Sequence, residues 1–347
     1  MRPLSKEWTV MLYMGALDKG QSAADKDVLA ALDAVVRPMR NVECIYQLTT
    51  GDDTILGRVA GTGKKEILAR TPAIDLLDPD ELTRFVDWTH QHYPSRYTAL
   101  FLKDHGTGID TRPPASDIHL TGIFVDGNKS MPVTALRTAI ERTKRGRVDV
   151  YGLDACEMAW VELGYEVREV SSFFIATEVM EKNTGWHYEN IVCHLEDCGE
   201  SLGPRELTPY VVEQSKEATS ANTIALEVAW MDELADAIEA LAHELFARVG
   251  EFAPWAAARY ADPPTDMVDL AILIADLRAD PAWQSLLSLA AVGLALREAT
   301  RAGNGLVIFL PLQAGSRAFA TYGALEFPQT NYWARLVSTV NSVLLAD

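Results

Sequence analysis

Apolar runs of strand length alternate, over the first 180 residues, with segments in which apolar residues recur at helical spacing. The apolar runs indicate buried strands at 8–14, 42–50, 97–108, 147–156 and 172–178. Helical periodicity and helix-start residues indicate helices at 22–39, 78–93, 132–146 and 157–170. Hairpins are expected at 54–70 and around Asp126-Gly127. Strands that alternate with helices predict an α/β fold, in which helices cover both faces of a mainly parallel sheet.

The pattern changes after about residue 200, where long amphipathic segments become more frequent. We expect strands at 222–230 and 304–312, helices at 231–249, 281–303 and 331–345, and a loop at 252–266, where prolines interrupt the sequence. We therefore divide the chain into an α/β domain at 1–200 and a C-terminal α/β extension at 201–347, packed on the same sheet.

Composition narrows the classes of partner and compartment. The 347 residues carry a formal net charge of −18, which opposes binding to nucleic acid and to anionic membranes and favours basic ligands. No apolar run reaches the length of a membrane span. Four cysteines in a chain of this length do not form a disulfide framework and suit a reducing compartment. Glu7 interrupts the basic start of the chain, so the sequence favours a cytoplasmic protein without a signal peptide.

Candidate chemistry lies at the ends of two expected strands. The stretch VYGLDACEMAW places Cys156 among carboxylates, whereas a structural cysteine is usually surrounded by apolar residues. The stretch LFLKDHGTGID ends another strand at His105-Gly106. A thiolate nucleophile needs a neighbouring base and backbone donors for the oxyanion, and Gly106 allows an acyl group to approach closely. Because parallel strands end at the same edge of a sheet, we expect His105 and Cys156 to meet there.

Taken together, these stretches resemble the clostripain family of cysteine peptidases, in the wider group that includes caspases, legumain and gingipains. The segments WTVMLYMGALD, YGLDACEMAWVELGYEV and IATEVMEKNTGWHY also carry the resemblance. It implies a caspase-like α/β/α sandwich in which residues 1–200 form the catalytic domain. It further implies a dyad of His105 and Cys156, with an oxyanion hole formed by the N–H groups of Gly106 and Cys156. A histidine about 50 residues upstream of the cysteine is also the caspase spacing.

The resemblance also implies a specificity pocket. Asp154 matches the acid that faces an Arg or Lys before the scissile bond, and a carboxylate pairs well with a guanidinium group. The following loop departs from the family, because Thr184 stands where a second acid is often found. Other residues of this region expected to contribute to substrate binding are Glu178, Glu181 and Trp186, the last either as a pocket wall or as a packing anchor.

The sequence therefore predicts an endopeptidase that cleaves protein or peptide substrates after Arg or Lys. Two alternatives stay open: a catalytically silent caspase-like regulatory or binding protein, and a different Cys–His acyl hydrolase. Asp104 is not expected to orient His105, because neighbours on a strand point to opposite faces. The mixture of His and Cys at 187–198 fits no zinc spacing, so no metal site is expected. Calcium dependence occurs in the family, but scattered acids such as Asp52 and Asp53 do not establish it here. Control by internal cleavage or by an activating partner is also left open.

Overall fold

The computed structural model describes residues 6–16, 19–62, 64–109, 121–126, 129–180, 182, 184–261, 266–312 and 319–346. Its centre is a nine-stranded sheet in the order β13-β11-β10-β9-β5-β1-β2-β3-β4. The bounds of these strands are β1 (Lys6–Ala16), β2 (Val42–Thr50), β3 (Asp53–Val59), β4 (Lys65–Pro72), β5 (Ser95–Lys103), β9 (Val150–Asp154), β10 (Phe173–Thr177), β11 (Thr223–Glu227) and β13 (Thr300–Gly303). The five central strands from β10 to β2 pair in parallel, and the strands at both edges pair antiparallel. This confirms the predicted mainly parallel sheet.

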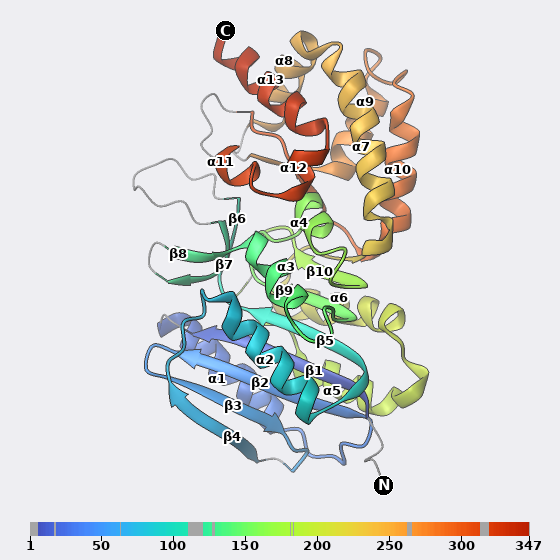
Figure 1. Cartoon of the computed structure of the whole chain (residues 1–347). Helices are drawn as coiled ribbons and strands as arrows, with labels where there is room; N and C mark the ends of the chain where they lie inside the picture. The colour runs from blue at the N-terminus through green and yellow to red at the C-terminus, as the bar shows by residue number, and fades with distance from the viewer. Residues whose placement is uncertain are drawn as a thin grey trace.

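Helices cover both faces of this sheet, because the central strands are apolar on both sides. On β5, Leu100 and Leu102 belong to one buried cluster, whereas Ala99 and Phe101 belong to another on the opposite face. The first face is covered by α2 (Pro79–His92), α3 (Val133–Glu141) and α4 (Val161–Glu166). The second is covered by α1 (Lys19–Asp33), α5 (Tyr188–Cys198) and α6 (Pro204–Thr219). The result is the expected α/β/α sandwich (Figure 1).

The remaining elements extend this core. Two small sheets are formed by β6 (Gly106–Ile109), β7 (Thr121–Asp126) and β8 (Lys129–Pro132), and by β12 (Met267–Asp269) with β14 (Val307–Phe309). The later helices are η1 (Gly199–Ser201), η2 (Val228–Trp230), α7 (Met231–Phe246), α8 (Val249–Tyr260), α9 (Leu270–Ala279), α10 (Ser288–Ala299), α11 (Phe319–Tyr322), α12 (Glu326–Thr330) and α13 (Trp333–Ala346). In Figure 1, α7 to α10 and α13 gather at the end of the molecule opposite to β2–β4. Because β11 and β13 join the main sheet, residues after 200 contribute directly to the central layer; the division of the chain at residue 200 stays a prediction.

Several helix predictions were wrong in extent. The loop expected at 252–266 is helical as far as Tyr260, because α8 buries Phe252, Ala253 and Ala256 despite an internal proline. The helix expected at 157–170 starts only at Val161, since Glu157 has a φ of 56° and forms a turn. The helix expected at 281–303 covers only 288–299, because the next four residues pair with β11. No helix in the described part of the chain is long and apolar enough to cross a membrane.

Candidate active site

The ends of β5 and β9 bring the histidine and cysteine segments into contact. Lys103 and Asp154 are opposite each other in the parallel pair, and the Asp104 N–H donates to the Asp154 carbonyl at 3.4 Å. A Cβ placed on Gly106 would lie only 2.2 Å from the Cys156 carbonyl oxygen and 3.0 Å from the Cys156 nitrogen. The two main chains are therefore packed directly together just beyond the edge of the sheet.

The cysteine occupies a tight turn that other elements hold in place. Cys156 is partly exposed, and Glu157 after it is exposed and has a φ of 56°. A non-glycine residue in this left-handed region is uncommon and is found most often at turns and functional sites. The Glu157 N–H donates to the Val179 carbonyl at 3.3 Å, and the indole N–H of Trp160 donates to the Glu157 carbonyl at 2.5 Å. The turn therefore presents the thiol on a fixed backbone.

The partly exposed His105 follows directly on the buried Asp104. One carboxylate oxygen of Asp104 accepts the backbone N–H of His105 at 2.5 Å, so Asp104 holds the main chain of the histidine. The other carboxylate oxygen of Asp104, Oδ2, packs against Gly15 of β1 and occupies the space that a Cβ at that position would need. Burial raises the pKa of Asp104 to about 7, against the opposing effect of the His105 N–H bond. Asp104 is thus a buried acid whose protonated form is favoured by burial.

Asp154 is buried on the α1 side of the sheet and is tied to the segment that follows β10. Only 3% of the residue is exposed. The same oxygen, Oδ2, accepts the backbone N–H of Trp186 at 3.0 Å and the hydroxyl of Tyr188 at 2.6 Å. Two donors on one carboxylate oxygen fix the orientation of the Asp154 side chain. Asp154 therefore lies two residues before the thiol as a carboxylate enclosed by protein.

Lys103 and Asp25 complete a buried ion cluster with Asp154, and neither was identified as a candidate from the sequence. The ammonium group of Lys103 contacts Asp25 Oδ1 at 2.5 Å, and the two side chains are 3% and 0% exposed. Burial acts to lower the pKa of Lys103, but the carboxylates of Asp154 and Asp25 outweigh burial and raise it. A signal was present: Lys103 ends an otherwise apolar strand, and strand alternation places it on the same face as Phe101.

The other predicted substrate-binding residues are dispersed. Glu178 is partly buried and accepts a hydrogen bond from the Asn222 side chain at 3.0 Å. Thr184 is exposed, and its hydroxyl donates to the Ala218 carbonyl at 3.3 Å. Glu181 lies outside the described residues. The structure thus groups Asp154 with Trp186 and directs Glu178 and Thr184 towards other elements.

Trp186 has the contacts of a packing anchor. It is 1% exposed, and its ring packs edge-on against Phe101 with 5.8 Å between ring centroids. It belongs to the buried cluster between the sheet and α1, α5 and α6. Its backbone N–H, rather than its ring, is the group that reaches Asp154.

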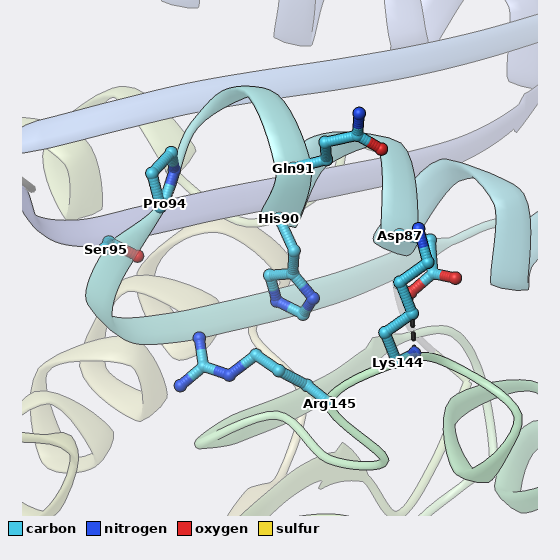
Figure 2. Close-up of a pocket in the computed structure, with 7 residues that line it drawn as sticks. All are labelled: Asp87, His90, Gln91, Pro94, Ser95, Lys144 and Arg145. Atoms are coloured by element: carbon cyan, nitrogen blue, oxygen red, sulfur yellow. Dashed lines mark hydrogen bonds between the residues drawn. The ribbon is translucent and has the colours of Figure 1, made fainter.

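Two cavities are found among the described residues. One, of about 420 Å³, is lined by residues of α2, the start of β5 and the turn after α3, including His90, Lys144 and Arg145 (Figure 2). Because a strand rises about 3.3 Å per residue, the length of β5 separates it from His105 by roughly 25 Å. The other, of about 330 Å³, is lined by residues of α9, α10 and the β13 region. Within the described ranges, no three His, Cys, Asp or Glu residues are grouped to hold a metal ion.

Comparisons with known proteins identify a family and several chains of similar fold. A family model described as the clostripain family matches residues 13–273. An inactive zymogen C11 protease from Parabacteroides distasonis is similar in structure, with a TM-score of 0.72 and 16% identity, covering 97% of this chain and 99% of that one. A secreted C11 cysteine protease from Bacteroides thetaiotaomicron, iotapain, has a TM-score of 0.70 and 14% identity, covering 96% of this chain and 100% of that one. A structure of a secreted C11 protease from the same species with an irreversible peptide inhibitor has a TM-score of 0.69 and 16% identity, covering 96% and 99%. No functionally curated protein matches the sequence.

Proposed function

This chain belongs to the clostripain family of cysteine peptidases, and from that premise we propose that Cys156 is its nucleophile and His105 its general base. The observation that carries the proposal is the close contact of Gly106 with Cys156, where a Cβ would lie 2.2 Å from the Cys156 carbonyl oxygen. This contact joins two segments in which a histidine and a cysteine follow neighbouring core strands at one edge of the sheet. Both residues are also partly exposed, as a reacting pair must be.

The proposed reaction has two halves. His105 takes the thiol proton, the Cys156 sulfur attacks the carbonyl carbon of the scissile peptide, and His105 then protonates the leaving amine. Water, with His105 as base, next attacks the thioester, which releases the new carboxyl group and restores the thiol. The backbone N–H groups of Gly106 and Cys156 would bind the oxyanion in both halves. The close approach of the two main chains supports this pair of donors, because a Cβ on Gly106 would lie 3.0 Å from the Cys156 nitrogen.

For the substrate, we propose a protein or peptide with Arg or Lys before the scissile bond. Asp154 supports this class, because it is the acid two residues before the proposed nucleophile and its Oδ2 is held in place by two hydrogen-bond donors. The net charge of −18 adds a weak, salt-dependent attraction for basic chains. Glu178 is directed to Asn222, so Asp154 is the principal acid in this proposal. Cytoplasmic location and an activating partner stay predictions, and two of the similar structures are described as secreted proteases.

The test is hydrolysis of fluorogenic peptides with Arg, Lys, Asp, Asn or Leu before the reporter. We expect cleavage after Arg and Lys, and we expect Cys156→Ala and His105→Ala each to lower kcat at least a thousandfold. Cys193→Ala is the matched control, because Cys193 is likewise a partly exposed cysteine but lies on α5. Full activity in Cys156→Ala would overturn the assignment of the nucleophile.

Two further outcomes separate the alternatives. A folded wild type that cleaves no peptide, with or without calcium, would favour a silent binding protein. Faster hydrolysis of esters than of matched peptides, lost in Cys156→Ala, would favour another acyl hydrolase. Cleavage after Leu or Asp, in place of Arg and Lys, would retain the dyad and remove the proposed role of Asp154.

A further inference from the structure

We propose that Lys103 is a specificity-determining residue: as an internal cation held by Asp25 and Asp154, it weakens the preference for Arg or Lys before the scissile bond. The proposal rests on the proposed function, because it concerns the acid assigned to substrate recognition. It adds a residue that competes with the substrate for that acid. Removing the Lys103 ammonium group should therefore strengthen selection for a basic side chain.

Lys103 lies beside Asp154 because the two residues are on neighbouring strands of the sheet. The two residues are partners in the register of β5 and β9, so their side chains lie on the same face of the sheet. Asp25 of α1 closes the cluster from the covering layer, with 2.5 Å between its Oδ1 and the Lys103 ammonium nitrogen. The main chain passes directly over the pair at Gly185, where a Cβ would lie 2.4 Å from Lys103 Cε and 3.2 Å from Asp154 Oδ2. The cluster is thus enclosed by α1 and by the segment that contributes Trp186.

The charges explain why Lys103 acts as a competitor. Two buried carboxylates would be unfavourable without a cation, and the buried ammonium group supplies it. A substrate Arg or Lys side chain would supply the same charge to the same acids. With Lys103 in place, a second cation gains less from Asp154 and is repelled by the ammonium group. The pKa of Lys103 is raised by Asp154 and Asp25, so the side chain stays charged at neutral pH.

A purely packing role would not need a lysine at this position. Phe101, two residues earlier on the same face, is fully buried and apolar. A methionine would fill similar space without the desolvation that an ammonium group requires. The position therefore carries a charge because the acids facing it need one. This reasoning makes Lys103→Met the informative substitution.

The experiment compares two peptides that are identical except for Arg or citrulline, its neutral isostere, before the scissile bond. We expect the ratio of kcat/KM for Arg over citrulline to rise at least tenfold in Lys103→Met. The double variant Asp25→Asn/Lys103→Met leaves Asp154 as the one charged group of the cluster, so it retains the net charge of the wild type and guards against misfolding. It should show the same rise. Lys144→Met, a change of an exposed lysine, should leave the ratio unchanged.

Binding gives a readout that does not depend on catalysis. In a Cys156→Ala background, calorimetry should show that Lys103→Met increases the affinity ratio of the Arg peptide over the citrulline peptide by a similar factor. Adding Asp154→Asn should abolish the increase. If folded variants lacking Lys103 keep the wild-type ratio in cleavage and in binding, the inference is wrong even though the peptidase assignment stands. If the ratio shifts in binding while the wild type cleaves nothing, the proposed function fails, and Lys103 competes with a basic side chain for Asp154 in binding alone.

Discussion

Replacing Gly106 with alanine tests the contact on which the active-site assignment depends. The added Cβ would lie 2.2 Å from the Cys156 carbonyl oxygen, whereas ordinary contacts begin at 3.4 Å. Both atoms at this contact belong to main chain or to a Cβ, so no flexible side chain can move aside. The histidine and cysteine segments must therefore separate by about 1 Å, a misplacement that can reduce catalysis about 100-fold. The φ of Gly106 is not in the positive range, so the effect is steric rather than conformational.

The expected result is a loss of about 100-fold in kcat/KM for an Arg peptide, because both dyad geometry and the oxyanion donors are displaced. Overpacking should also lower the free energy of unfolding by about 1–3 kcal/mol, measured in urea at pH 7. Gly51→Ala is the control, since nothing lies within 4 Å of its Cβ position in the turn between β2 and β3. It should retain wild-type activity. Gly106→Ala with more than half of the wild-type kcat/KM would refute the close approach of the two strand ends.

Three further predictions concern buried polar groups and are measured by urea unfolding. Burial, and next the charge of Arg145, lower the pKa of His90 to about 4, so the unfolded chain binds a proton that folded His90 excludes. The wild type should therefore lose about 2 kcal/mol more than His90→Gln between pH 7.5 and pH 5; equal losses would contradict this. Burial raises the pKa of Glu162 to about 7, so the folded chain holds this proton and loses stability as the pH rises from 5 to 8. The free energy of unfolding of the wild type should fall by about 3 kcal/mol over this pH range, and Glu162→Gln should not show this fall. If the two proteins lose the same free energy of unfolding between pH 5 and pH 8, this role of Glu162 is wrong. Tyr188→Phe should cost about 1.5–3 kcal/mol, because the hydroxyl donates to the Asp154 carboxylate at 2.6 Å; a neutral effect would show that this bond adds nothing.

The central strands were predictable because their sequences are apolar on both faces. The run at 42–50 became β2 with the same bounds, and the hairpin at 54–70 became β3 and β4. The approach of the segment after β5 to the segment after β9 was also predictable, since successive core strands in an alternating α/β sequence often lie side by side. Helix α5 was missed because its histidines and cysteines were considered as metal ligands rather than as residues of an amphipathic helix.

The environment of Asp154 could not be predicted, because its partners come from distant parts of the chain. Asp25 lies on α1, and Tyr188 at the start of α5 reaches the acid from 34 residues away. The local sequence pattern predicts strand alternation, which places Lys103 on the same face as Phe101. It does not predict which helix covers that face. The partners of a buried charge depend on tertiary packing. The sequence therefore predicted an acid at this edge and did not predict its counter-ion.

Charged side chains are buried at the strand ends beside the proposed dyad, and their positions bear on the function proposed for this edge of the sheet. Lys103 and Asp104 are adjacent in the chain, buried on opposite faces of the sheet, and followed at once by His105. Apolar residues at these positions would avoid the desolvation that burial of a charge requires. Natural sequences depart from local packing rules mainly where function requires it. On one face, Asp104 fixes the histidine backbone, and on the other, Lys103 balances the acids beneath the proposed substrate pocket. Asp104 directly follows Lys103, the last residue of β5, so a shift of this strand would move the proposed base and the proposed specificity residue together.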